Sequence, residues 1–413
     1  MQRRLSPSTP AVAAALALLL AACGSGGGAG NPDWKPQPSF SGEAHLPKIE
    51  PALPTPAGPG QGSQAPPPVS SSPRQSPSPS PSEESDPQVV AKKVNAPTGI
   101  TVMPDHSALV AERATGRVLR VQPKADQPVE TVRTLIGSQI NDLTLSPNYA
   151  EDNLIYAYVT TKTDNRVVTF TLKGAVTPVL VGIPKGATNN AGRIAFDSIG
   201  ELYVATGDAG AAADATDPKS LAGKVLRVTD IGDPVPSNPT TGSAVFASGL
   251  HAPAGICTNV PDLTDPNKPV PEPTGKEPVL EVEAGKGGVV LVNQVRAGKW
   301  LQQAPDDALA TLPAGFTYPG GCAIFDEALY VTSLDGQQLL RAELTISGSQ
   351  LTVGKWEPIF KDKRYGRLLT VTAGTDGSLW LATSNKDGKG KPVADDERII
   401  RIMASGGGGN SPV

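Results

Sequence analysis

The segment Gly99-Ile-Thr-Val-Met-Pro-Asp-His106 is followed by Ala108-Leu-Val-Ala-Glu-Arg113 and then by Arg117-Val-Leu-Arg-Val121. Each segment contains a short apolar run, and turn residues such as Pro, Asp and Gly separate the runs. Short runs of Val, Ile and Leu bounded by turn residues are typical of antiparallel β-strands. The three segments therefore predict consecutive strands of one small sheet.

This pattern returns five more times along the chain. The later copies begin at Leu143, Ile194, Gly255, Gly321 and Val371, at intervals of 44 to 66 residues. Such intervals suit one four-stranded sheet plus variable loops, and no segment shows the helical periodicity that a solenoid of helices needs. We therefore predict an all-β fold, a six-bladed β-propeller over residues 88–404, in which the strand 88–92 completes the last blade.

The N-terminal region is typical of an exported, lipid-anchored protein. Residues 1–22 combine Arg3 and Arg4 with an apolar core, which predicts a signal peptide. The core ends in Leu20-Ala21-Ala22-Cys23 and resembles a bacterial lipoprotein box, so we expect a lipid such as palmitate on Cys23. The alternative is an ordinary secretory signal with a chance cysteine. We expect the protein at the extracytoplasmic face of the cell membrane, tethered rather than spanning.

Proline is concentrated between this signal and the repeats. Of the 42 prolines, many fall in residues 23–87, which include Pro66-Pro67-Pro68 and a Ser-Pro alternation. Segments of this composition do not bury a core, so we expect a disordered spacer there and a disordered tail over 405–413.

The formal net charge of −4 offers no basic surface for a phosphate backbone, which argues against nucleic acid as a partner. We expect a monomer.

Two cysteines remain after the lipidation site. Cys257 and Cys322 each lie within two residues of a glycine at the start of a predicted first strand, in consecutive copies of the repeat. Because an isolated pair outside the cytoplasm is more often bonded than free, we predict a disulfide between them. Two buried free thiols are the alternative.

Several longer segments resemble one family in the order in which that family has them. They are Thr163–Val168, Gly192–Phe196, Leu202–Gly210, Asp217–Arg227, Gly366–Leu368, Thr383–Gly388 and Asp395–Arg401. In these segments the chain resembles the PQQ-dependent glucose/sorbosone dehydrogenases, which are soluble six-bladed quinoproteins. The resemblance extends over essentially the whole propeller. It implies a site at the central mouth of the propeller.

The chain departs from the family at most of the positions that carry the chemistry. Asn189 stands where the family has its histidine base, and an amide is not basic near neutral pH. The cofactor-binding Arg-Asn pair is replaced by His251 and Ala252. A lysine expected nearby is Asp335, which repels a tricarboxylate cofactor. Of the two arginines in the last motif, only Arg367 remains. These losses resemble those of a degenerate branch of actinobacterial lipoproteins.

Other candidate sites are weak. The chain has three histidines, His45, His106 and His251, too few for a histidine-rich metal centre. The acidic run 395–397 with Asp387 lacks the ligand spacing of a calcium loop, and we predict a solvated turn there. The segment 207–210 looks like a phosphate loop but is predicted to be a blade turn, with no helix after it and with Asp208 capping backbone amides.

These observations favour a binding or scaffold module in the cell envelope, with an unidentified ligand or protein partner at the mouth. No catalytic residue and no cofactor is expected. The candidate mouth residues are Asn141, Asp142, Asn189, Arg193, Asp208, His251, Asp335 and Arg367. One alternative is a sugar dehydrogenase that uses PQQ and calcium through a rearranged site. Another is a hydrolase with a metal held by Asn141, Asp142, Asn189 and Asp208.

Overall fold

The computed structural model of the chain describes residues 86, 88–261, 263–264, 272–301, 304–348 and 350–404. The predicted signal peptide, the predicted lipidation site Cys23, nearly all of the proline-rich segment and the tail 405–413 lie outside these residues. No helix among the described residues is long and apolar enough to cross a membrane.

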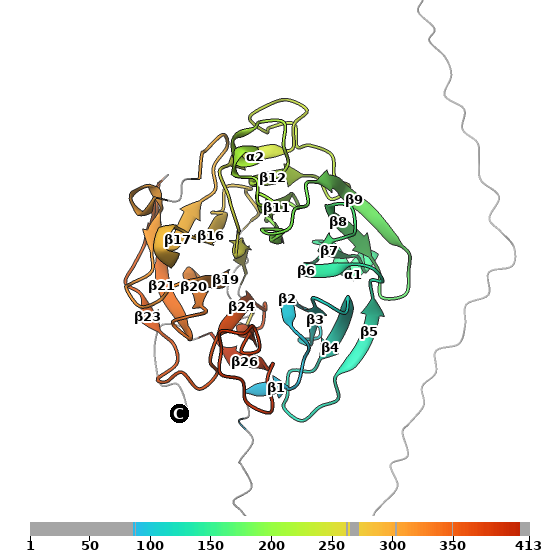
Figure 1. The fold of residues 1–413 in the computed structure, drawn as a ribbon, viewed down its shortest axis with the longest axis vertical. Coiled ribbons are helices and arrows are strands. Elements are labelled where there is room, and N and C mark those ends of the chain that lie inside the picture. The colour runs from blue at the N-terminus through green and yellow to red at the C-terminus, as the bar shows by residue number, and fades with distance from the viewer. Residues whose placement is uncertain are drawn as a thin grey trace, which may run out of the picture. The chain divides into compact units, whose positions relative to one another are not determined.

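Six sheets surround a common centre, with β2, β6, β19 and β24 labelled close to it (Figure 1). All strand pairs in them are antiparallel except β15–β19. Blade 1 consists of β2 (Pro97–Val102), β3 (Ala108–Glu112), β4 (Arg117–Val121) and β5 (Glu130–Thr134). Blade 2 consists of β6 (Gln139–Leu145), β7 (Ile155–Thr160), β8 (Asn165–Phe170) and β9 (Val176–Ile183). Blade 3 consists of β10 (Gly192–Phe196), β11 (Leu202–Thr206), β12 (Lys224–Val228) and β13 (Val245–Ser248).

The second half of the chain forms the other three sheets. Blade 4 consists of β14 (Gly255–Cys257), β16 (Leu280–Ala284), β17 (Val290–Gln294) and β18 (Ala310–Thr311). Blade 5 consists of β19 (Pro319–Phe325), β20 (Ala328–Ser333), β21 (Gln338–Ser347) and β22 (Gln350–Val353), joined by β15 (Asn259–Val260) and β23 (Glu357–Pro358). Blade 6 consists of β24 (Leu368–Ala373), β25 (Ser378–Thr383), β26 (Ile399–Met403) and β1 (Val89–Ala91). Short helices lie in the loops: α1 (Tyr149–Asp152), α2 (Ala212–Thr216), η1 (Lys286–Gly288) and η2 (Pro305–Asp307).

The six-bladed propeller predicted from the repeats is confirmed. All six predicted starts fall in first strands, namely β2, β6, β10, β14, β19 and β24. The predicted closing strand is also present: Val89 and Ala91 of β1 pair with Ile400 and Ile399 of β26. The beginning and the end of the propeller therefore share one sheet, in which β1 is the outer strand, and this pairing closes the ring.

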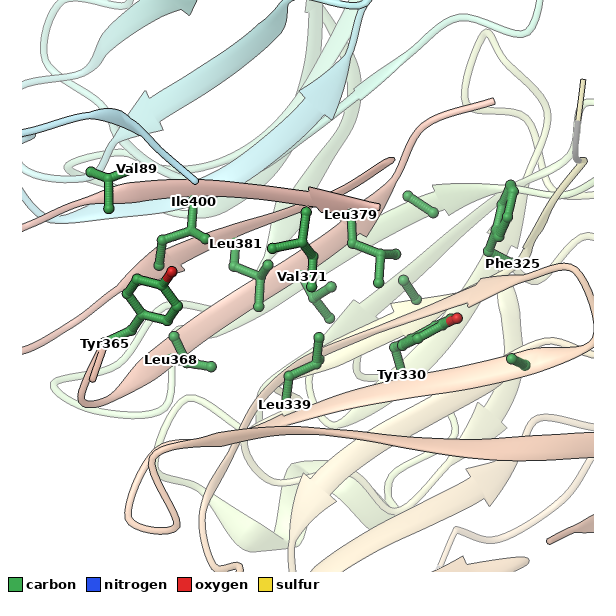
Figure 2. Close-up of a cluster of buried hydrophobic side chains, with 14 residues drawn as sticks. Val89, Phe325, Tyr330, Leu339, Tyr365, Leu368, Val371, Leu379, Leu381 and Ile400 are labelled. Carbon is green, nitrogen blue, oxygen red and sulfur yellow. The ribbon is translucent and has the colours of Figure 1, made fainter. Parts of the chain in front are cut away.

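Each blade packs against two neighbours, so its middle strands are buried on both faces. All six residues of β7, β20 and β25 are buried. This explains why these strands are almost continuously apolar in sequence rather than alternating with polar residues. Figure 2 shows one interblade core, in which Tyr330 and Leu339 of blade 5 face Leu379 and Leu381 of blade 6. Burial of one such leucine contributes roughly 2 kcal/mol.

The predicted disulfide between Cys257 and Cys322 is present, with their Cα atoms 5.9 Å apart. It links β14 of blade 4 to β19 of blade 5. Gly255 permits this close approach, since a Cβ there would lie 2.9 Å from both the backbone nitrogen and the sulfur of Cys322. Both cysteines line a central cavity of about 240 Å³ between the first strands of the blades. The disulfide is therefore a cross-link in the channel wall.

Candidate functional site

The predicted mouth residues lie at the end of the propeller where the first strand of each blade begins, either in loops at that end or near the start of a first strand. They come from β6, β10 and the loops before β10, after β11, before β14, after β20 and before β24. The structure divides them into three groups. The members are Asn189, Asp208 and His251; Asn141, Asp142 and Arg193; Asp335 and Arg367.

The first group is centred on the buried carboxylate of Asp208. Asn189 donates from Nδ2 to Asp208 Oδ1 over 2.8 Å, and His251 Nδ1 lies 2.5 Å from Oδ2. The backbone nitrogen of Gly210 also donates to Oδ1, over 2.8 Å, which agrees with the predicted capping role of Asp208. Burial opposes ionisation, but the bonds from Asn189, His251 and Gly210 outweigh it and lower the pKa of Asp208.

The bond to Asp208 determines which ring nitrogen of His251 carries the proton. Because Asp208 is ionised and can only accept, His251 must carry a proton on Nδ1, which leaves Nε2 as the acceptor of the neutral ring. The His251 side chain is 35% exposed, whereas that of Asp208 is 3% exposed. His251 is thus a partly accessible imidazole held by a buried carboxylate, an arrangement that can accept a proton.

A short helix follows this group, and the prediction that no helix would follow residues 207–210 is wrong. Helix α2 begins at Ala212, directly after the turn. Sequence reasoning also missed Lys224, which is fully buried and donates from Nζ to the carbonyl oxygens of Asp214, Ala215 and Ala222 over 2.6 to 3.1 Å. An ammonium at these carbonyls satisfies the end of the helix and fixes the loop after Asp208. The basic residue within an apolar strand was the available signal.

Two buried glutamates beside this group were also missed. Glu283 accepts a hydrogen bond from the backbone nitrogen of His251 over 3.1 Å, and Glu281 accepts one from Asn293 Nδ2 over 2.9 Å. Both are fully buried, and within the described chain the second carboxyl oxygen of each has no partner. Burial raises the pKa of Glu283 to about 7 and that of Glu281 well above its usual value. The signal was the alternation Leu280-Glu-Val-Glu283, which places both carboxyls on one face of β16.

The second group lies in the channel wall. Arg193 donates from Nη1 to the Asn141 carbonyl over 3.1 Å and from Nη2 to the Gly320 carbonyl over 3.3 Å, so its side chain connects blades 2, 3 and 5. Asp142 Oδ1 lies 3.9 Å from Arg193 Nη1, and Oδ2 accepts from the Ile194 nitrogen over 3.0 Å. Burial raises the pKa of Asp142 to about 6, against the opposing effect of Arg193. Arg193 is thus bonded within the protein.

The third group is an ion-pair cluster. Arg367 donates from Nη1 to Asp335 and from Nε to Asp387, the latter over 2.7 Å. The Arg367 side chain is only 6% exposed. Two carboxylates therefore enclose Arg367. Its charge is compensated within the protein.

The prediction of a solvated turn at residues 395–397 is wrong for two of the three residues. Asp396 and Glu397 are buried. The Glu397 carboxylate accepts from Thr383 Oγ1 and from the backbone nitrogens of Asn385 and Lys386, and Asp396 pairs with Arg398 over 2.7 Å. These bonds replace the water that an exposed acidic turn would use, so the run stabilises the loop before β26.

Among the described residues, no group of three or more His, Cys, Asp and Glu side chains could hold a metal ion. The four residues considered for a hydrolase lie in two groups. Asn189 and Asp208 belong to the first, and Asn141 and Asp142 to the second.

Comparison with known proteins agrees with the fold. The family model described as glucose/sorbosone dehydrogenase matches residues 94–262. The PQQ-bound aldose sugar dehydrogenase from Streptomyces coelicolor is 30% identical, with a TM-score of 0.66 over 76% of this chain and 96% of that chain. A putative oxidoreductase (glucose dehydrogenase) from Thermus thermophilus is 31% identical, with a TM-score of 0.64 over 76% of this chain and 98% of that chain.

More distant structures share the fold alone, such as the soluble aldose sugar dehydrogenase from Escherichia coli, which is 19% identical with a TM-score of 0.55 over 77% of this chain and 99% of that chain. No curated protein matches the chain. With 30% identity to a relative that it covers almost completely, the chain belongs to the glucose/sorbosone dehydrogenase family.

Proposed function

We propose that the propeller binds a ligand at its mouth in the cell envelope and does not oxidise sugars through PQQ. The observation that carries this proposal is the pairing of Arg367 with Asp335 and Asp387. PQQ carries three carboxylates, and a protein holds such a group with free cations. Here the retained arginine is already compensated, so a PQQ carboxylate would have to compete with two protein carboxylates.

The position of the family base supports the same conclusion. Asn189 donates its amide to Asp208, and an amide does not take up a proton near neutral pH. The cations of the second group do not replace the missing ones, because Arg193 is bonded to two backbone carbonyls. The residues that stand at the family's cofactor and base positions therefore do not fit PQQ.

A second candidate function is a dehydrogenase with a rearranged site. The pair His251–Asp208 favours it, since a carboxylate-bound imidazole at the mouth could serve as a relocated base. This candidate requires PQQ to be held without the family's cations. The binding function remains the preferred proposal for that reason.

The test adds PQQ and calcium to the purified chain lacking the signal peptide, followed by aldoses and a redox dye. We expect no dye reduction, and the PQQ-bound aldose sugar dehydrogenase from Streptomyces coelicolor serves as the positive control. Turnover above the protein-free rate would overturn the proposal. If turnover occurred, its loss in His251→Asn would then assign the relocated base.

The proposal places the propeller at the outer face of the cell membrane through a lipid on Cys23. The support is the box Leu20-Ala21-Ala22-Cys23 together with the proline-rich spacer that follows it. Metabolic labelling with palmitate should mark the native chain in the membrane fraction, and Cys23→Ala should remove both the label and the membrane association. A native chain that is unlabelled and released into the medium would contradict the anchor.

A further inference from the structure

A second cavity lies at the mouth end of blade 2. It has a volume of about 440 Å³ and is formed by the segment before β6, the β7–β8 turn and the loop between β9 and β10. The polar and charged side chains that line it are Gln139, Thr160, Thr161, Lys162, Lys185 and Asn190. This volume is in the range of sites that bind small molecules.

The charge of this cavity is positive. Lys162 and Lys185 come from two different loops, and no Asp or Glu contributes to the lining. In the part of the chain that the structure describes, neither lysine has a carboxylate within ion-pair distance. The nearest acid in sequence, Asp164, already accepts from Arg166 Nε over 2.9 Å, from Thr161 Oγ1 over 2.8 Å and from the Gly182 nitrogen over 3.0 Å. The two ammonium groups are therefore available to an anion.

The wall between the two lysines is held in place by side-chain bonds. Asn190 Oδ1 accepts from the Gly186 nitrogen over 3.0 Å and from Asn165 Nδ2 over 3.2 Å, while Asn190 Nδ2 donates to the Gly186 carbonyl over 2.9 Å. Asn165 is itself buried and donates to the Pro184 carbonyl over 2.7 Å. A loop fixed in this way loses little entropy when a ligand binds.

The cavity adjoins the Asn189–Asp208–His251 group. A Cβ at Gly186 would lie 1.7 Å from the carbonyl oxygen of Ala209, so the loop that carries Lys185 lies directly against the turn after Asp208. In addition, the Ala209 nitrogen donates to the Asn189 carbonyl over 3.1 Å. The cavity therefore adjoins the turn that follows Asp208, the carboxylate that holds His251.

From this arrangement we propose that the cavity binds a small hydroxylated molecule that carries a phosphate or carboxylate group. The lysines receive the anionic group as point charges, and the exposed amide of Gln139 can bond to the polar body. The hydroxyls of Thr160 and Thr161 are bonded to Asn165 and Asp164, so they hold the cavity wall in place. The inference rests on the proposed binding function and names the chemical class of its ligand. Phosphate and carboxylate share the required charge, and the experiment separates them.

The test is calorimetric titration of the chain lacking its signal peptide with glucose 6-phosphate, glucuronate and glucose at low salt. We expect at least one anion to bind tenfold more tightly than glucose. The double variant Lys162→Gln/Lys185→Gln should weaken that anion at least tenfold, and Lys162→Arg/Lys185→Arg should retain most of the affinity. The matched control is Lys124→Gln/Lys173→Gln. It removes two exposed lysines of blades 1 and 2 that lie at the end of the propeller away from the mouth.

Stronger binding of glucose 6-phosphate assigns a phosphate, and stronger binding of glucuronate assigns a carboxylate. Glucose binding equal to that of both anions, an absence of anion binding, or an unchanged affinity in the glutamine double variant with an unchanged melting temperature would each overturn the inference. These outcomes are independent of dye reduction with PQQ, so failure of the cavity and failure of the proposed function can be told apart.

Discussion

Two parts of the propeller mouth differ in how their charges are used. On the paired side, which consists of Asp208, His251, Asp335, Arg367 and Asp387, each side chain is bonded to another member. On the open side, which consists of Arg113, Lys162 and Lys185, the described residues offer no carboxylate partner within ion-pair distance. An ion pair within the protein competes with a charged ligand. The charges of the paired side therefore stabilise the fold, whereas those of the open side can bind an anion.

The comparison also explains how a family member can keep its fold while its mouth changes. The interblade cores consist of residues such as Leu379 and Leu381, which do not reach the mouth. The charge of Asp335 at the mouth is compensated within the protein by Arg367. Residues of the paired side should therefore affect stability, and residues of the open side should affect binding.

The largest expected effect concerns the cross-link below the paired side. Cys257→Ala/Cys322→Ala removes a bond that spans a sequence separation of 65 residues, and the free energy of unfolding should fall by about 4 kcal/mol on the chain-entropy model. Urea unfolding with and without a reducing agent measures this change. A loss below about 1 kcal/mol would show that the ring closes firmly without the disulfide.

The next effect is a pH dependence at Glu283, which lies next to the paired side and accepts a hydrogen bond from the His251 backbone nitrogen. Burial raises the pKa of Glu283 from the usual 4.5 to about 7, so folding disfavours its charge. The native chain should lose stability as the pH rises from 4.5 through 7, because the unfolded state releases the proton first. Glu283→Gln should therefore be equally stable at pH 4.5 and more stable by about 3 kcal/mol at pH 8. Urea unfolding across this range measures the difference.

Glu277 should show the opposite dependence of stability on pH and serves as a control for Glu283. Burial is outweighed by bonds from Ser198 and Thr274, which lower the pKa of Glu277 to about 2. Its ionised form stabilises the fold above pH 4.5, and that stability is lost as the pH falls toward 2. Glu277→Gln should thus be destabilising at neutral pH. If the free energy of unfolding of Glu283→Gln changed with pH in parallel with that of the native chain, the raised pKa of Glu283 would be contradicted.

A smaller loss of stability is expected at the ion-pair cluster. Arg367→Met leaves Asp335 and Asp387 facing each other without a cation, which should cost about 2 kcal/mol. The matched control is Arg364→Met, whose pair with Asp362 is more than half exposed on both sides and should leave the melting temperature unchanged. Equal melting temperatures for both variants would mean that the cluster is not structural.

The fold could be predicted from the sequence because its signal is repeated and local. Each blade contributes an apolar strand, a turn and a second apolar strand, and the copy at Gly99 alone shows the pattern. Six copies and a closing strand at Val89 leave little freedom in how the strands pair. Even the weakest copy, at Gly255, is correctly placed as the first strand of its blade.

The mouth is harder to predict because its properties come from partners far apart in sequence. Asp335 and Arg367 each stand out in the sequence, but their pairing depends on a contact across 32 positions. His251 looks like a lone loop histidine, whereas Asp208, 43 residues earlier, holds its ring. Glu397 in the acidic run looks solvated for the same reason, since Thr383 Oγ1 and the backbone nitrogens of Asn385 and Lys386 satisfy it only in the folded chain.

The smallest expected effect tests how far the open side extends. The Arg113 side chain is exposed, and its turn lies against the segment that enters the cavity, because the Leu135 nitrogen donates to the Gly116 carbonyl over 2.7 Å. Gly137 of that segment lines the cavity. Arg113→Gln should weaken anion binding only about twofold at low salt, since an exposed charge acts through solvent.

Titrations with glucose 6-phosphate at low salt and at about 0.5 M salt decide the matter, with Lys124→Gln as the single-charge control. A through-solvent effect should vanish at high salt, where the screening length is only about 4 Å. A tenfold loss that persists at high salt would instead place the Arg113 guanidinium in contact with the anion. The open side would then be one continuous site across blades 1 and 2, and the division between charges for stability and charges for binding would follow the blades themselves.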